Sequence, residues 1–567
     1  MKYLKEIIRR NKRLILFYLV TGFGIAFFTN YKVDYFQKVI DGFIDGTLEL
    51  KGILYYGGML LSHYVLNYID EYPAKKLEHG IYLDFKVLAL RKISQIDYKE
   101  YQSLGTGKLI QRIENGAESG RSLLYDFWLC FVRELLPTIV FSIFFIWKIN
   151  SKIMYILLSG YVIVFIVTNF LLKILYQIKE RILLNEEQLN HYLVRGFMEM
   201  LVFRIERKFP SELKKAEHSK DEIVDAKVKM NLIHEAFFPI FALLIACIDV
   251  SILLYGYFEK TISVGEIVAL ITLIENAYTP IAIFNVLYVQ YKLDKTSFQR
   301  FERFLDLKED EQLKNGKSIS SLSMDISIQD LIFAYDEKII LQHLSFSIKK
   351  GEKVAFVGES GSGKSTLIKI FAGLLKSERG SILYGNTELK DIYLESYYEH
   401  LTYISQDTPI FDGTIRENLM FGEEKTEEEI LKVLNCVQLQ ELISNLEYGI
   451  DTKIGERGSN LSGGEKQRLA LARLWFEDRD IIIFDEATSA LDNLTEELVM
   501  KEVLQVCKDK TVITIVHRLN TIKEYDKIIV LKQGKIVEMG KFNELINNNG
   551  YFKKLYDYGQ TMKSMER

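Results

Sequence analysis

Cysteine is scarce in this chain, and its scarcity limits the kinds of site that the chain can hold. The 567 residues include four cysteines, which lie far apart and form no CxxC pair: Cys130, Cys247, Cys436 and Cys507. A zinc site or a disulfide framework needs closely spaced cysteine or histidine residues, so we expect neither. This cysteine usage fits a protein of the cytoplasm or of a membrane.

An excess of charge of one sign is also missing. Lysine and arginine number 72, aspartate and glutamate number 76, and the formal net charge is −4. This balance argues neither for nor against the binding of nucleic acid. Because the motifs described below point to other partners, we expect no nucleic acid. The length leaves room for roughly two to four domains.

Long apolar runs are confined to the first part of the chain. Six stand out, at about 14–31, 53–70, 127–147, 153–175, 236–258 and 264–290. Each is close to the ~20 residues that a helix needs to cross ~30 Å of hydrocarbon. The pattern predicts an all-α transmembrane domain of six spanning helices over residues 1–307. The second and sixth runs are weaker, because His63 and Glu275 interrupt them.

A basic cluster precedes the first apolar run and suggests its orientation. The cluster consists of Lys2, Lys5, Arg9, Arg10, Lys12 and Arg13. A signal peptide has a similar pattern, but this run is longer than a signal core and no small-residue cleavage site follows it. We interpret it as an uncleaved first span with a cytoplasmic N-terminus. Six crossings then return the second half to the cytoplasm, as expected of a multi-pass protein of the cell membrane.

The two longest connections between spans are charged and have helical periodicity. Residues 85–124 show this periodicity, broken near Gly105 and Gly107, and 186–213 show a similar helix–break–helix pattern. Loose amphipathic linkers would have related compositions. We favour stiff cytoplasmic hairpins, each with a short transverse helix at its tip.

Ionisable residues inside the predicted spans need a reason to be there, because each costs roughly 2.5–3.5 kcal/mol at the centre of a bilayer. The candidates are His63, Glu134, Asp249 and Glu275. Arg133 stands beside Glu134 and is able to pair with another span, which gives Glu134 a structural role. Asp249 and Glu275 either face a central cavity and favour a cationic or peptide substrate, or form hydrogen bonds between helices.

Residues 308–323 are polar and lack periodicity, as expected of a linker, and a different pattern follows them. The strand-like KVAFV (353–357) leads into a glycine-rich loop and then a helix. The loop fits the pattern GxxxxGK[ST] and contains Gly358, Glu359, Ser360, Gly361, Ser362, Gly363, Lys364, Ser365 and Thr366. Such a loop holds the phosphates of a nucleotide, with the lysine at the β and γ phosphates and the serine at Mg²⁺. The sequence therefore predicts an ATP site with Mg²⁺.

A second motif, DIIIFDEATSALD (480–492), ends an apolar strand in two carboxylates. In a parallel sheet this strand end lies where ligands bind. Adjacent residues on a strand point to opposite sides, so the two carboxylates are expected to have different roles. We assign Asp485 to Mg²⁺ through water, and Glu486 to the attacking water as a general base.

These motifs, together with LSGGEKQR (461–468), carry a resemblance to a known family. Residues 324–560 resemble the nucleotide-binding domain of ATP-binding cassette (ABC) transporters, and the six spans ahead of them resemble an exporter-type half-transporter. The resemblance implies an α/β P-loop ATPase domain over residues 324–567. It also implies roles for further residues: adenine stacking for Tyr335, Mg²⁺ sensing for Gln406, communication across a dimer for Asp492 and contact with the γ-phosphate, as a catalytic residue, for His517.

The resemblance also explains why the chain has two glycine-rich phosphate motifs but only one lysine-bearing loop. In the family, Ser462, Gly463 and Gly464 of one copy complete the ATP site of another. The chain is therefore expected to pair with a second half-transporter in the lipid bilayer. Its intact motifs favour a homodimer over a heterodimer, without excluding the latter. Loop tips near 106–116 and 197–205 are expected to carry motion to the spans.

The expected function is ATP-driven export of a peptide, lipid or drug-like substrate. Two alternatives use the same cassette. One is an importer with the exporter fold, as in siderophore uptake, and the other is a cassette ATPase without transport. The six apolar runs oppose the second alternative.

Overall fold

The structure, a computed structural model, describes residues 2–565 except for 105, 260–261, 407–408, 421–424, 456–457, 517 and 520. The chain divides into two compact units. The helical unit contains Met1–Ser94 and Leu104–Leu307, and the sheet unit contains Gln95–Ser103 and Lys308–Arg567. The short segment 95–103 therefore belongs to the unit that follows it, which the sequence did not predict.

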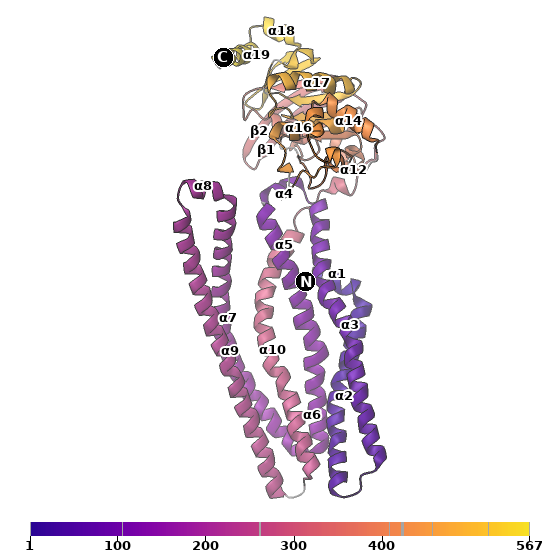
Figure 1. Ribbon diagram of the computed structural model, residues 1–567, viewed down its shortest axis with the longest axis vertical. Coiled ribbons are helices and arrows are strands. Elements are labelled where there is room, and N and C mark those ends of the chain that lie inside the picture. The colour runs from indigo at the N-terminus through magenta and orange to yellow at the C-terminus, as the bar shows by residue number, and fades with distance from the viewer. Residues whose placement is uncertain are drawn as a thin grey trace. The chain divides into compact units, whose positions relative to one another are not determined.

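The helical unit consists of long helices (Figure 1). They are α1 (Lys2–Arg10), α2 (Lys12–Ile44), α3 (Leu50–Gln95), α5 (Thr106–Arg121), the π-helical η1 (Ser122–Leu129) and η2 (Phe131–Leu135), α6 (Leu136–Ile149), α7 (Ser151–Met198), α9 (Phe209–Glu259) and α10 (Val264–Leu305). Because α5, η1, η2 and α6 follow one another directly, each of the six predicted apolar runs lies in a separate long helical segment. The predicted fold class is confirmed for this unit.

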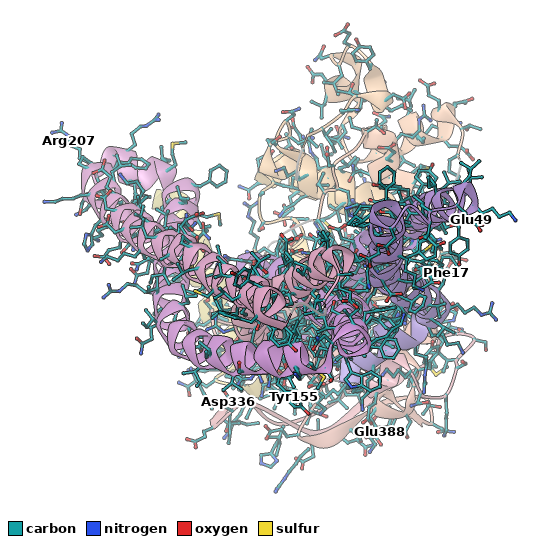
Figure 2. The ribbon with its side chains drawn as sticks, turned by 90° about the horizontal axis from the view of Figure 1, so that it is seen from below. Phe17, Glu49, Tyr155, Arg207, Asp336 and Glu388 are labelled. Atoms are coloured by element: carbon teal, nitrogen blue, oxygen red, sulfur yellow. The ribbon has the colours of Figure 1, made fainter. Side chains whose placement is uncertain are left out.

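Apolar side chains cover much of the outside of these helices. Phe17 is 48% exposed and Tyr155 is 67% exposed, and both lie at the outer surface in Figure 2. Taken singly, two segments of the described chain are long and apolar enough to span a membrane, Lys12–Ile44 and Leu109–Ile149; Ala242–Phe258 is a shorter apolar helix. An apolar outer surface of this kind is suited to hydrocarbon rather than to water.

A buried ion pair links two of the helical segments. Arg133 in η2 forms ion pairs with Asp70 in α3 and with the neighbouring Glu134. The Arg133 guanidinium also lies 4.3 Å from the ring centroid of Tyr18 in α2. At Gly22, a Cβ atom would lie 2.1 Å from Cγ of Arg133, so the glycine makes room for this side chain. The prediction that Arg133 pairs with another span is confirmed.

Short helices separate the long ones at the hairpin tips. Helices α7 and α9 run side by side and are joined through α8 (Met200–Ile205), with Arg207 directly after it (Figures 1 and 2). This tip lies within the predicted range 197–205. The first tip is different: helix α4 (Tyr98–Leu104) precedes the predicted range 106–116, which forms part of α5. The Asp97 carboxylate accepts a hydrogen bond from the Lys99 amide at 2.9 Å at the start of α4. The predicted break near Gly105 and Gly107 falls between the end of α4 at Leu104 and the start of α5 at Thr106, and Gly105 itself lies outside the described residues.

The sheet unit contains two sheets. The strands are β1 (Ile326–Tyr335), β2 (Lys338–Ile348), β3 (Lys353–Val357), β4 (Arg379–Tyr384), β5 (Thr387–Glu388), β6 (Leu401–Ile404), β7 (Ile481–Asp485), β8 (Thr511–Ile515), β9 (Lys527–Lys532) and β10 (Lys535–Gly540). One sheet is antiparallel, in the order β2-β1-β4-β5. The other has the order β10-β9-β3-β8-β7-β6, in which β9, β3, β8, β7 and β6 are parallel.

Helices cover both faces of the parallel sheet. The α-helices of this unit that follow β3 are α11 (Lys364–Phe371), α12 (Leu394–Tyr398), α13 (Ile415–Met420), α14 (Glu427–Cys436), α15 (Gln440–Ser444), α16 (Gly463–Ala472), α17 (Asn493–Val506), α18 (Phe542–Asn547) and α19 (Tyr551–Met565). The strand residues alternate between two cores. Ile481 and Ile483 of β7 pack on the side of α11, whereas Ile482 and Phe484 pack on the side of α16 and α17. This alternation fixes where side chains at the strand end point.

The predicted linker, residues 308–323, packs onto the sheet unit. Ile96 pairs with Glu309 across an antiparallel bridge, and the Asp97 amide donates a hydrogen bond to the Lys308 carbonyl at 3.0 Å. Leu322 is fully buried in the core beside α11. The segment therefore forms part of the sheet unit.

Candidate nucleotide site

The glycine-rich loop lies between β3 and α11, at the carboxyl edge of the parallel sheet. Gly358 has a φ of 152°, and a Cβ atom there would lie 2.1 Å from the Leu531 carbonyl oxygen of β9. Gly363 has a φ of 100° and precedes the first residue of α11. Other residues cannot adopt this path without strain or steric overlap. The loop thus brings backbone close to the positive end of α11, which suits an anion.

Lys364 lies inside its own loop. Its Nζ donates hydrogen bonds to the carbonyl oxygens of Gly358 and Glu359 at 2.8 and 2.9 Å. Burial lowers the pKa of Lys364, and the negative charges of Glu486 and Asp485 oppose that change. The buried Ser362 hydroxyl has no hydrogen-bond partner in the described part of the chain. A phosphate group would supply acceptors to both side chains, so the loop fits a nucleotide.

The loop residues with exposed side chains are Glu359, Ser360 and Ser365, and Thr366 is half-buried. The Glu359 carboxylate accepts a hydrogen bond from the Tyr551 hydroxyl of α19. Ser365 stands in the first turn of α11, next to Lys364. The nine residues of the predicted motif are therefore continuous: Gly358–Gly363 form the turn after β3, and Lys364, Ser365 and Thr366 begin α11.

The two carboxylates lie at the end of β7, separated from β3 by β8. Asp485 is 6% exposed and continues the row of Ile481 and Ile483, which faces α11. Glu486 has a φ of 54°, a backbone conformation that costs energy for any residue other than glycine. Asp485 ends β7 and Glu486 begins the turn after it, so the expectation that the two carboxylates have different roles stays a prediction.

Tyr403 is a site residue that the sequence motifs did not indicate. It lies on β6, beside β7, and its hydroxyl donates a hydrogen bond to the Asp485 carboxylate at 2.9 Å. Burial and the nearby Asp485 charge raise the pKa of Tyr403. Gln406 follows the same strand with an exposed side chain. The parallel pairing of β6 with β7 brings these residues together.

The second glycine-rich motif forms the start of α16. Ser462 is the N-cap: its Oγ accepts a hydrogen bond from the Glu465 amide at 3.3 Å, and the Glu465 carboxylate accepts one from the Ser462 amide at 2.7 Å. Ser462 and Gly463 are exposed, and Gly464 is half-buried. The neighbours of Gly463 and Gly464 come from Ala490 and Leu491, whereas those of the phosphate loop come from β2, β9 and Gly534.

Gln467 connects α16 to two other loops. Its amide nitrogen donates hydrogen bonds to the Ser489 hydroxyl at 3.1 Å and to the Gln406 carbonyl at 3.4 Å. Its amide oxygen accepts one from the Ala490 amide at 2.9 Å. The motif identified Gln467, but only the structure shows these partners.

The remaining predicted residues are Asp492, Tyr335 and His517. Asp492 is the N-cap of α17, and hydrogen bonds from Thr495 and Leu494 hold its pKa below the ordinary value. Tyr335 ends β1, is half-buried and packs edge-on against Phe333 at 4.9 Å. His517 lies outside the described residues.

A parallel sheet that carries a lysine-bearing phosphate loop and an acidic strand end defines a P-loop ATPase, here joined to a unit of long apolar helices. The chain belongs to the ABC transporter family. The family model described as ABC transporter transmembrane region matches residues 14–280, and the model described as ABC transporter matches residues 341–489. The chain is accordingly a membrane protein with an ATP-binding and ATP-hydrolysing cassette.

Two relatives illustrate the match. The ATP-dependent lipid A-core flippase of Francisella tularensis subsp. tularensis (strain FSC 198) is 39% identical over 251 residues, 44% of this chain and 41% of the flippase. The ATP-dependent permease MDL1 of Candida albicans is 45% identical over 249 residues, 42% of this chain and 36% of the permease. The chain thus matches about two fifths of the length of these relatives.

A solved structure resembles the whole chain. A bacterial Atm1-family ABC exporter with ATP bound superposes with a TM-score of 0.82, at 23% identity, and covers 97% of this chain and 98% of the exporter. At this identity the likeness establishes the fold: a helical transmembrane domain followed by a nucleotide-binding domain that contains the sheets.

Proposed function

We propose that the chain is one half of an ATP-driven exporter, which works as a dimer and moves a lipid, peptide or drug-like substrate out of the cytoplasm. The observation that carries the proposal is the exposed start of α16. Ser462 and Gly463 present a hydroxyl and a helix N-terminus to the outside of the sheet unit. Such a helix end is an anion site, and its neighbours differ from those of the phosphate loop. A second copy would supply the phosphates that it binds.

Within one ATP site, some residues bind the nucleotide and others take part in its hydrolysis. Lys364 and the loop amides hold the phosphates, Tyr335 stacks on adenine, and Ser462, Gly463 and Gly464 of the other copy close the site. Glu486 accepts a proton from the attacking water. His517 contacts the γ-phosphate. When the cassettes of the two copies come together, these groups reach the phosphate and water is excluded from the ATP site.

The donor set also suits Mg²⁺. In the part of the chain that the structure describes, no group of three or more His, Cys, Asp or Glu side chains is placed to hold a metal ion. Magnesium at nucleotides takes one or two protein oxygens and otherwise uses phosphates and waters. Ser365, Gln406 and the Asp485 carboxylate, oriented by Tyr403, offer such oxygens. When bound, Mg²⁺ neutralises charge that develops on the phosphates.

Export is supported by the relative that is named a flippase and by the exporter to which the fold is similar. The match of the transmembrane model over residues 14–280 opposes a cassette ATPase without transport. Binding of ATP would bring the sheet units of the two copies together, and hydrolysis would let them separate. The short helices α4 and α8 would pass this motion to the spans.

Transport in membrane vesicles tests the proposal. Inside-out vesicles that contain the purified chain are given a fluorescent phospholipid, a labelled peptide or a cationic dye, with and without ATP. Export predicts ATP-dependent movement of at least one probe into or across these vesicles, absent in the Glu486→Gln variant. Movement in the opposite direction would contradict export and support import.

A further inference from the structure

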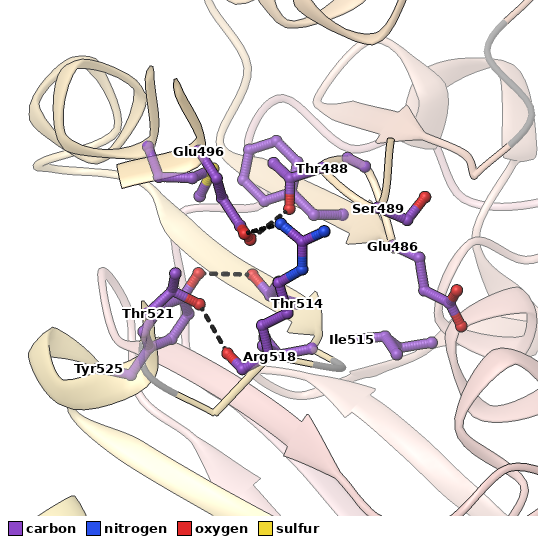
Figure 3. A pocket seen from close by; sticks show the side chains of 13 residues that line it. Glu486, Thr488, Ser489, Glu496, Thr514, Ile515, Arg518, Thr521 and Tyr525 are labelled. Atoms are coloured by element: carbon purple, nitrogen blue, oxygen red, sulfur yellow. Dashed lines mark hydrogen bonds and ion pairs between the residues drawn. The ribbon is translucent and has the colours of Figure 1, made fainter. Parts of the chain in front are cut away.

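A cavity beside the turn that follows β7 contains a cluster of polar side chains (Figure 3). The cavity is lined by residues from β7, β8 and α17 and from the segments after them, including Phe484, Glu486, Met500, Ile515, Arg518 and Tyr525. Figure 3 shows the Arg518 guanidinium pointing toward Glu496, while the Glu486 side chain extends away from both. One ion pair therefore crosses the cavity.

The ion pair joins two segments that are distant in the sequence. Nη1 of Arg518 lies 2.8 Å from Oε2 of Glu496, whose side chain is 5% exposed. The other oxygen of Glu496 accepts a hydrogen bond from the Thr488 hydroxyl at 2.8 Å. Nη1 of Arg518 also donates one to the Leu491 carbonyl at 2.6 Å. The Glu496–Arg518 pair is thus hydrogen-bonded to the turn after β7 at two residues, Thr488 and Leu491.

The position of Glu496 fixes the orientation of its carboxylate. It lies in the first turn of α17, where the positive end of the helix stabilises a carboxylate. Its two oxygens have different partners, a hydroxyl and a guanidinium, so the carboxylate is oriented on both sides. Gln467 forms hydrogen bonds with Ser489 and Ala490 in the middle of the same turn. Each residue from Thr488 to Leu491 therefore has a partner outside the turn.

We propose that the Glu496–Arg518 pair is a positioning device for ATP hydrolysis. It fixes the turn that begins with Glu486 and ends at Asp492, and it ties this turn to the segment after β8, where Arg518 directly follows His517 in the chain. Neither Glu496 nor Arg518 belongs to the phosphate loop. The pair consequently affects the rate of hydrolysis and leaves ATP affinity nearly unchanged. The proposal rests on ATP hydrolysis alone and is independent of the direction of transport.

The test separates positioning from simple support of the fold. The full chain, purified in lipid nanodiscs, is compared with Glu496→Gln, Arg518→Met and the double variant Glu496→Leu/Arg518→Met. We measure kcat, the Kd of ATP and Tm. Each single variant is expected to lower kcat at least ~10-fold, because small displacements of catalytic groups are costly, with Kd within about threefold. The double variant is expected to have a Tm close to that of the wild type, since apolar replacement of both members of a buried pair is often neutral. Its kcat is expected to stay low.

A matched control removes another ion pair from the opposite edge of the sheet. Lys527 at the start of β9 lies 2.8 Å from Glu352, and Glu352→Gln should leave kcat at the wild-type value. Two results would overturn the proposal: wild-type kcat in Glu496→Gln, or recovery of both Tm and kcat in the double variant. If the single variants do not fold, the double variant still decides between these outcomes. Absence of transport by the wild-type chain, with its normal kcat, would instead count against the proposed export and would leave the comparison of kcat among the variants intact.

Discussion

The two units place their polar residues in different ways. In the sheet unit, the site residues lie on short turns at the ends of adjacent strands, so each motif of a few residues carries its own geometry. In the helical unit, the buried polar contacts join separate helices: Arg133 and Asp70 are 63 positions apart. The motifs expected to contact nucleotide in the first unit are therefore local in sequence, although Tyr403 reaches Asp485 from 82 positions away. The buried ion pair of the second unit belongs to no motif. The predictions below test this difference.

The largest effect is expected at the end of β7. Replacement Glu486→Gln removes the proposed general base while it keeps the shape of the side chain. We expect kcat for ATP hydrolysis to fall ~10²–10⁴-fold, with the Kd of ATP within about threefold. Steady-state ATPase assays and nucleotide binding measure the two quantities. The exposed Glu497 of α17 provides the control, since Glu497→Gln should change neither, and sustained hydrolysis by Glu486→Gln would disprove the assigned role.

The second effect concerns the long-range pair of the helical unit. Arg133→Met leaves the buried Asp70 without its guanidinium and should destabilise the helical unit by about 3–5 kcal/mol. The double variant Arg133→Met/Asp70→Leu should recover much of this loss. Thermal unfolding in detergent, followed for both variants, checks the difference. If the double variant is no more stable than Arg133→Met, the stability of the helical unit does not depend on the Arg133–Asp70 ion pair.

A smaller effect is expected at the phosphate loop. Lys364→Met removes an ammonium that bonds to charged phosphate, and hydrogen bonds to charged groups contribute about 1.5–3 kcal/mol, so ATP affinity should fall roughly 10–100-fold. Fluorescent-nucleotide titration measures this loss. Lys369→Met at the end of the same helix serves as the control and should bind ATP as the wild type does. Equal affinity of the Lys364 variant and the wild type would exclude the loop as the nucleotide site.

The smallest effect is expected for the two carboxylates that were candidate substrate contacts. One oxygen of Asp249 is buried and has no hydrogen-bond partner in the described part of the chain, whereas Glu275 is exposed. Glu275→Gln should therefore change stability by less than about 0.5 kcal/mol. Asp249→Asn replaces a half-buried carboxylate with a neutral amide of the same shape and should not lower Tm. A clear fall in Tm would assign them a structural role. With Tm unchanged, loss of cationic-dye transport in vesicles would make either one a substrate contact.

Sequence motifs predicted most of the candidate nucleotide site because its residues are consecutive. The strand–loop–helix pattern around Lys364 and the strand end at Asp485 need only local backbone geometry. The motifs did not predict Tyr403, Glu496 or Arg518 as parts of the site. The partners of these residues depend on which strands are neighbours in the sheet. A short sequence motif does not predict that β6 and β8 flank β7.

In the helical unit, the sequence predicted the six apolar runs and one of the two hairpin tips. The first tip was placed too late, because the short helix α4 precedes the break near Gly105 and Gly107 instead of following it. The backbone bridge between Ile96 and Glu309 draws the segment Gln95–Ser103 into the sheet unit. This pairing spans more than two hundred positions and has no sequence signature.

The central claim is that each ATP site is built from two cassettes. Nanodiscs that hold a single copy of the chain can be separated from those that hold two, and ATPase activity per chain can be measured in each. We predict hydrolysis in the two-copy discs, with only residual activity in the single-copy discs. Equal kcat per chain in both preparations would contradict the account.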